Sequence, residues 1–116
     1  MNKTELNIRQ SLLSTLTFLA SEYQQLDFAA QVQYASYQGE FSCWWFDTFF
    51  PEEPEATRMF SSRQLSILTG FSEHFNRSLA ELPSAPFSIQ QLLATPQWKS
   101  VIAKAQEAMR EVQGDA

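Results

Sequence analysis

Cysteine occurs once in the 116 residues, as Cys43, so the chain cannot form an intramolecular disulfide framework or a multi-cysteine zinc or iron–sulfur site. This cysteine usage fits a reducing compartment, and we expect a cytoplasmic protein. The N-terminal segment MNKTELNIRQ is polar. The LLSTLTFLA run after it is interrupted by hydroxyls and is too short to span about 30 Å of hydrocarbon. We therefore expect neither an export signal nor a membrane partner.

Glycine and histidine are also scarce, which excludes further kinds of site. The three glycines stand alone, so no glycine-rich loop is available to cradle a phosphate, and nucleotide enzymes of that type are excluded. His74 is the single histidine, whereas a metal site needs three or four converging ligands. We expect a partly exposed imidazole at His74, no bound metal and no other cofactor.

Lysine and arginine are missing between Arg9 and Arg58, in a chain whose formal net charge is -5. A nucleic-acid partner is excluded, because neutralising phosphates requires clustered Lys and Arg. The same segment contains seven carboxylates without an intervening cation: Glu22, Asp27, Glu40, Asp47, Glu52, Glu53 and Glu55. A protein that binds this segment is therefore expected to be basic.

Strand signals are missing as well, because alternating β-branched residues do not occur and Gln, Ala, Leu, Glu and Ser dominate. Ten Phe, three Trp and three Tyr supply much of the area from which a core can form. A chain of this length fits one domain. We predict a single all-α domain over residues 1–116, built as a compact bundle of five or six helices.

Three helices are predicted in the first half of the chain. The first covers residues 4–25 with Thr4 as its N-cap, and its apolar residues recur at helical spacing as Leu6, Leu12, Leu13, Leu16, Leu19 and Tyr23. Asp27 is predicted to cap the second helix, which Gly39 ends. The third, aromatic helix covers residues 41–50 and ends at Pro51, whose ring cannot continue the hydrogen-bond ladder.

The PEEPE run that follows is predicted to be an exposed acidic loop. A Ser-x-x-Gln capping box at Ser61 begins a long helix that continues to Leu82, and the aromatic helix is expected to pack beneath it. A tight connection at residues 84–86 precedes a second capping box at Ser88, and the Thr95-Pro96 pair begins the last helix. The predicted apolar face of that helix is Trp98, Val101, Ile102, Ala105, Met109 and Val112.

Two groups of reactive side chains are assigned structural roles. Cys43 and His74 would act as nucleophile and base only if the thiol ionised, but burial among aromatic residues keeps a thiol protonated. We therefore predict a buried structural thiol. The PEEPE carboxylates lack the alternating Asp/Asn and central Gly of a calcium loop, and a flexible loop fixes no acid–base distance. No catalytic residue is assigned.

An interface is predicted where aromatic residues meet the carboxylates. The positions of the aromatic helix cannot all face inward, so Trp45 and Phe49 are expected at the surface. Apolar anchors supply most of the energy of a protein interface, and surrounding charges select the partner. The predicted partner-binding residues are Glu22, Asp27, Glu40, Trp45, Asp47, Phe49, Glu52, Glu53 and Glu55. The alternative is that the acidic surface serves solubility alone.

The segment WWFDTFFPEEPEATRMFSSRQLSILTGFSEHF, residues 44–75, combines an aromatic W-x-D-x-[FY]-x-P block with F-S-x-x-[EQ]-L-x-x-L-x-x-F. In this it resembles small bacterial proteins, some of which are similar to immunity proteins of contact-dependent growth inhibition systems. The resemblance covers about a third of the chain. It carries over to Trp45, Asp47, Phe49, Pro51 and residues 60–68.

The resemblance implies a non-enzymatic protein that binds and neutralises the C-terminal domain of a cognate toxin. Such a domain is often a nuclease whose basic substrate groove is blocked by an acidic surface. One alternative is a helical structural or regulatory interaction module, or a homodimer formed through an apolar face. The least favoured alternative is a carboxylate-based enzyme or metal protein, which requires Glu22, Asp47, Glu52 and Glu53 to converge in a pocket.

Overall fold

The computed structural model describes residues 1–84 and 88–114, and within these ranges it has seven helices and no strand. The prediction of an all-α protein is confirmed, whereas the predicted number of helices is slightly too low. The helices are α1 (Lys3–Leu19), α2 (Glu22–Gln31), α3 (Tyr37–Phe46), α4 (Ala56–Met59), α5 (Ser62–Glu81), α6 (Ile89–Ala94) and α7 (Pro96–Gly114).

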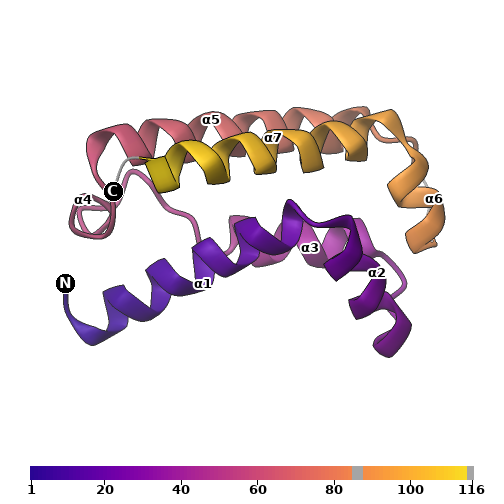
Figure 1. Ribbon diagram of the computed structural model, residues 1–116, viewed down its shortest axis with the longest axis horizontal. Coiled ribbons are helices and arrows are strands. Elements are labelled where there is room, and N and C mark those ends of the chain that lie inside the picture. Colours follow the sequence, from indigo (N-terminus) through magenta and orange to yellow (C-terminus); the bar gives the residue numbers. More distant parts are fainter. Residues whose placement is uncertain (85–87, 115–116) are drawn as a thin grey trace.

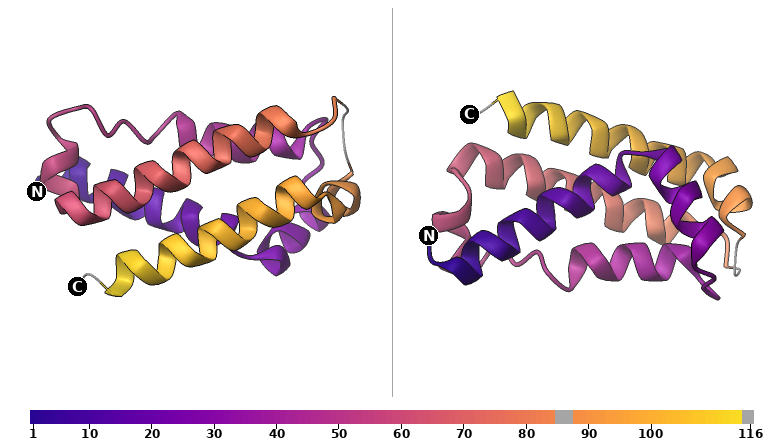
Figure 2. Two further views of the ribbon diagram at one scale, coloured as in Figure 1. Left: turned by 90° about the horizontal axis from the view of Figure 1, so that it is seen from above. Right: turned by 60° about the horizontal axis from the view of Figure 1, so that its bottom comes forward.

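The helices form two layers (Figure 1). The long helices α5 and α7 run antiparallel and side by side in one layer, and Figure 2 shows the same pairing from above. The other layer contains α1, α2 and α3, with α1 packed against α7. Two short helices close the ends of the molecule, α4 where α5 begins and α6 where α7 begins.

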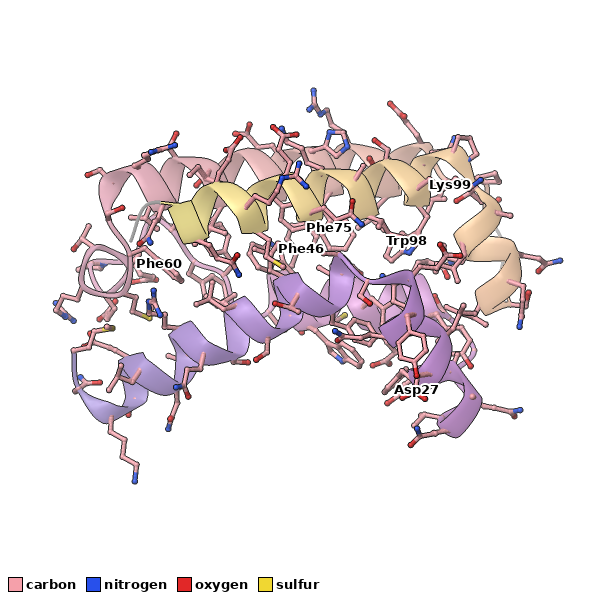
Figure 3. The ribbon with its side chains drawn as sticks, in the orientation of Figure 1. Asp27, Phe46, Phe60, Phe75, Trp98 and Lys99 are labelled. Atoms are coloured by element: carbon pink, nitrogen blue, oxygen red, sulfur yellow. The ribbon has the colours of Figure 1, made fainter. Side chains whose placement is uncertain are left out.

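Aromatic rings fill the space between the layers. The fully buried Trp45 of α3 lies 5.1 Å from Phe71 of α5 between ring centroids, and its Nε1 donates a hydrogen bond to Ser72 Oγ at 3.1 Å. The ring centroids of Phe46 of α3 and Phe75 of α5 lie 5.2 Å apart (Figure 3). The predicted packing of the aromatic helix against the long helix is therefore confirmed.

The first predicted helix is divided in two. Ser21 has extended backbone angles, and its Oγ accepts a hydrogen bond from the backbone N–H of Gln24, so α1 ends and α2 begins at this point. The N-cap of α1 is Asn2 and not Thr4. The predicted apolar stripe is wrong at both ends, because Leu6 and Tyr23 are exposed. The break accounts for Tyr23, which lies on α2 and not on a continuation of α1.

The predicted boundaries of the second helix are also wrong. Asp27 lies inside α2, where its carboxylate accepts a hydrogen bond from Gln31, and it caps no helix. Gly39 lies in the first turn of α3 and has no positive φ. Its N–H donates to Ser36 Oγ, which caps α3. The serine caps therefore determine the starts of both helices.

The predicted starts of the three later helices are confirmed. Capping boxes at Ser61 and Ser88 begin α5 and α6, and Thr95 Oγ1 accepts a hydrogen bond from the backbone of Trp98 at the start of α7. The predicted face of α7 lies against the core, fully buried at most positions and partly buried at Ile102 and Met109. The predicted connection at residues 84–86 falls largely outside the described residues.

A buried amide joins α2 to two other helices. Gln25 is completely buried, and its Nε2 donates to the carbonyl oxygens of Phe18 and Leu19 at the end of α1. Its Oε1 accepts from Trp98 Nε1 of α7 at 2.8 Å. This one side chain pairs two buried polar groups, the Leu19 carbonyl oxygen of α1 and the Trp98 indole N–H of α7, and it holds α2 in place.

Candidate functional site

The acidic residues of the first half of the chain lie in separate places. Glu22 and Asp27 are exposed on α2, whereas the PEEPE carboxylates precede α4, and Figure 1 shows α2 and α4 at opposite ends of the molecule. Asp47 is exposed just after α3, and Glu40 is half-buried in the first turn of α3. Glu55 has a cation nearby, Arg58 at 3.9 Å. The seven carboxylates therefore do not form one continuous surface.

The predicted aromatic anchors Trp45 and Phe49 are buried, so their expected exposure is wrong. They follow Phe41 at spacings of four residues, which places all three on the core side of the segment. Cys43 lies roughly 200° around the helix from both Phe41 and Trp45, and it is exposed, which corrects the prediction of a buried thiol. In this region the exposed aromatic side chain is Phe50, with 49% of its surface accessible.

A second exposed apolar surface lies on α2, where the sequence analysis assigned no binding residues beyond the two carboxylates. Tyr23 is 77% exposed, and Leu26 is also exposed. At roughly 100° per residue, these side chains and Ala30 form a stripe on the solvent side of α2. Glu22 lies at one edge of the stripe and Asp27 at the other. We call this set of five residues the α2 stripe.

The α2 stripe continues into a groove between α2 and α6 with a volume of about 480 Å³. Leu26 and Ala30 of the stripe line it, together with Tyr34, Tyr37 and Ile89. Both tyrosines are held in place: the Tyr34 ring stacks on Phe28 at 5.9 Å, and the Tyr37 hydroxyl donates to the Val32 carbonyl oxygen at 3.0 Å. The groove therefore presents apolar and aromatic side chains together with the polar side chains of Gln33, Ser88 and Gln90.

The electrostatic environment of this groove is negative. The sequences of α2, α3 and α6 contain no Lys or Arg, whereas Glu22, Asp27 and Glu40 contribute three negative charges. A positively charged surface that approached α2 would be attracted at long range, and its apolar side chains would find the stripe and groove. This arrangement can bind a protein segment.

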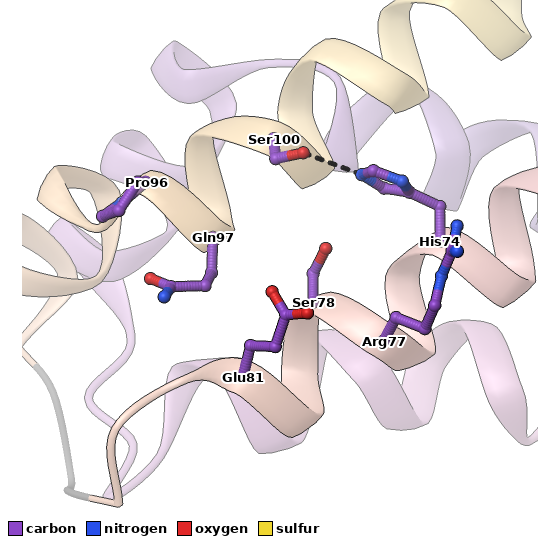
Figure 4. Close-up of a pocket in the computed structure, with 7 residues that line it drawn as sticks. All are labelled: His74, Arg77, Ser78, Glu81, Pro96, Gln97 and Ser100. Carbon is purple, nitrogen blue, oxygen red and sulfur yellow. Dashed lines mark hydrogen bonds between the residues drawn. The ribbon is translucent and has the colours of Figure 1, made fainter.

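A polar pocket of about 390 Å³ lies between α5 and α7 (Figure 4). His74 is half-buried there, in agreement with the expected partial exposure, and its Nε2 lies 2.8 Å from Ser100 Oγ. In the described part of the chain no carboxylate forms a hydrogen bond with the His74 ring. The pair therefore lacks the third group that orients the imidazole in a serine hydrolase triad.

The carboxylates required by an enzyme or metal protein do not converge. Glu22 lies on α2 at one end of the molecule, and Glu52 and Glu53 precede α4 at the other. Within residues 1–84 and 88–114, no three His, Cys, Asp or Glu side chains come together in a way that could hold a metal ion. The carboxylate-based alternative therefore has no site in the described structure.

One carboxylate is strongly engaged, although the sequence analysis did not single it out. Glu5 is 3% exposed, and it accepts hydrogen bonds from the Asn2 backbone N–H at 3.0 Å and from Arg58 Nε at 2.6 Å. The Asn2 hydrogen bond and the Arg58 guanidinium hold the pKa of Glu5 below its ordinary value. This contact ties α1 to α4 and has a structural role.

Comparison of the chain with protein-family models, curated proteins and solved structures finds no match. None of the helices in the described ranges has both the length and the apolar character needed to cross a membrane.

Proposed function

We propose that this protein is a non-enzymatic immunity protein that binds and neutralises the C-terminal domain of a cognate bacterial toxin through the α2 stripe. The observation that carries the proposal is an exposed apolar stripe between two carboxylates, beside a groove whose helices contain no cation. The resemblance of residues 44–75 to immunity proteins supplies the class of partner. We expect that partner to present a basic surface, such as the substrate groove of a nuclease.

The two kinds of side chain in the stripe are assigned different tasks. Glu22 and Asp27 accelerate the encounter with a basic surface, and this contribution is screened by salt. Tyr23 and Leu26 lose water-exposed apolar area when the partner covers them, so they slow dissociation. Because Tyr34 and Tyr37 are already fixed by contacts within the protein, the groove needs little reorganisation on binding.

Association kinetics with a candidate toxin domain, taken from a gene next to the one that encodes this protein, test the electrostatic part. The double variant Glu22→Lys/Asp27→Lys should associate about tenfold more slowly at low salt, and the wild-type rate should fall as salt rises. The matched control is Glu73→Lys/Glu111→Lys, which changes the net charge equally at exposed positions of α5 and α7. The control should stay within about twofold of the wild type.

A third reversal, Glu52→Lys/Glu53→Lys, compares the α2 stripe with the acidic loop beside Phe50. If this loop variant slows association and the α2 variant does not, the interface lies at the α4 end and our placement is wrong. The anchor variant Tyr23→Ala should dissociate about tenfold faster, whereas Leu6→Ala, an exposed control on α1, should not. A wild-type chain that neither binds the toxin domain nor protects cells producing it would refute the immunity role.

A second candidate function is a helical interaction module that pairs with a second copy of itself. The exposed side chains of Tyr23, Leu26 and Tyr34 favour it, because contiguous apolar surface at one end of a small protein often forms an interface. The negative charges at the edges of the α2 stripe disfavour this pairing, because the same charges of two copies would meet in the interface. The oligomeric state of the protein in solution therefore tests this second function.

A further inference from the structure

A small cavity opens between α1 and α7, away from the α2 stripe. Its volume is about 180 Å³, and its apolar lining consists of Leu13 and Leu16 from α1 with Met109 and Val112 from α7. Leu16 is fully buried and Val112 is 4% exposed, so they form the floor, while Leu13 and Met109 lie nearer the surface. An apolar cavity of about 150 Å³ is known to accept benzene, so this one is large enough for a single ring or a short alkyl chain.

The mouth of the cavity has one charged group. Among the described residues that line it, Arg9 alone is charged. The Arg9 side chain is held by a hydrogen bond from Nε to the Met59 carbonyl oxygen at 3.0 Å and by its position over the Phe60 ring, 5.4 Å from Cζ to the centroid. Its two terminal NH₂ groups have no hydrogen bond or ion pair to any described residue. They are available to an anion.

Two of the three neutral polar side chains that line the cavity, Thr17 and Gln64, are already engaged, and the third is the exposed Gln113. Thr17 Oγ1 donates to the Leu13 carbonyl oxygen at 2.9 Å, and the Gln64 amide takes part in the capping box of α5 and also donates to the Val112 carbonyl oxygen. The nearest carboxylate along α1, that of Glu5, is paired with Arg58. Two polar groups therefore remain for recognition of a ligand: the positively charged guanidinium of Arg9 and the neutral amide of Gln113.

We infer that this cavity binds a small monocarboxylate with an aryl or short alkyl tail. The tail lies against Leu13, Leu16, Met109 and Val112, where it leaves water, and the carboxylate accepts hydrogen bonds from the terminal NH₂ groups of Arg9. A single guanidinium matches a single negative charge, and its planar fork matches the two oxygens of a carboxylate. The site is separate from the α2 stripe and does not depend on the proposed immunity role.

Methyl NMR titrations of the full chain with benzoate and hexanoate test this site, with benzyl alcohol and 1-hexanol as neutral counterparts. The methyl signals of Leu13, Leu16, Met109 and Val112 should shift. For probes of this size, we expect a benzoate Kd on the order of 1 mM, about tenfold tighter than that of benzyl alcohol. The absence of any shift of these methyl groups with benzoate would overturn the inference.

Two variants identify the source of the affinity. Arg9→Gln should weaken benzoate binding about tenfold and leave benzyl alcohol unchanged, and because both probes are measured on the same variant, a general loss of stability cannot imitate this result. Arg110→Gln, an exposed control on α7, should change neither. Val112→Phe fills the cavity and should abolish both. Equal weakening of both probes by Arg9→Gln, or unchanged binding to Val112→Phe, would contradict the proposed site.

Discussion

Single residues show where sequence patterns were sufficient in this protein and where they were not. Trp98 was predicted in the core from its spacing on α7, and it is fully buried. Gln25 has no comparable local signal, because its burial depends on Trp98, 73 positions away in the chain. Cys43 is exposed although its neighbours in sequence are aromatic, because adjacent helical residues point in different directions.

The paired carboxylate Glu5 should make stability depend on pH. Since the folded state lowers its pKa, the pairing stabilises the protein above the ordinary glutamate pKa of about 4.3, and this stabilisation is lost as pH falls through the lowered value. Glu5→Gln should therefore reduce the free energy of unfolding at pH 7. The difference from the wild type should shrink below about pH 4.3, as measured by urea unfolding at a series of pH values.

Glu107→Gln is the matched control for Glu5, because Glu107 is exposed and meets Lys104 at 3.5 Å. Surface pairs of this kind contribute about 0 to 1 kcal/mol, so the control should follow the wild type at every pH. A Glu5→Gln difference of equal size at pH 7 and pH 3 would show that the charge of Glu5 has no part in the effect.

At the scale of helices, a start is predicted correctly where a capping residue precedes a clear apolar pattern. The boxes at Ser61 and Ser88 precede clear apolar patterns, and both were found. Ser21 has the same Ser-x-x-Gln spacing to Gln24, but the apolar periodicity of α1 continues through it to Tyr23, and this periodicity predicts one long helix. The same periodicity predicts Tyr23 on a core stripe, whereas the break places it on the exposed α2 stripe.

The cap at Ser21 gives a direct test of the break between α1 and α2. Ser21→Ala removes the acceptor of the Gln24 N–H, which lies 3.1 Å from Ser21 Oγ, and should lower the free energy of unfolding by about 1 kcal/mol. Ser14→Ala, an exposed position inside α1, should be neutral or slightly stabilising because alanine favours helix interiors. Chemical denaturation measures both changes. Equal stability of Ser21→Ala and the wild type would show that the cap does not maintain the break.

At the scale of the whole molecule, composition was sufficient for the fold class but not for the shape of the acidic surface. The segment between Arg9 and Arg58 has no cation in sequence, yet it reaches both ends of the molecule (Figure 1). Its carboxylates are divided among the α2 stripe, the first turn of α3 and the loop before α4. The number of residues between two carboxylates in the sequence does not tell how far apart they lie in the folded protein. The contacts that produce it join distant segments, such as Trp45 with Ser72.

The distribution of charge over the molecule also predicts its oligomeric state. A twofold homodimer formed through the α2 stripe would bring Glu22 and Asp27 of both copies into one interface, where like charges repel most strongly at low salt. We therefore expect light scattering to give the mass of one chain at about 20 mM salt, where the Debye length exceeds 10 Å. Glu22→Gln/Asp27→Asn should associate more readily, because its apolar stripe remains and its charge is gone, whereas Glu73→Gln/Glu111→Gln should stay monomeric. A wild-type dimer whose stability does not change with salt and in which Tyr23 is protected from solvent would favour the homodimer function over a basic partner.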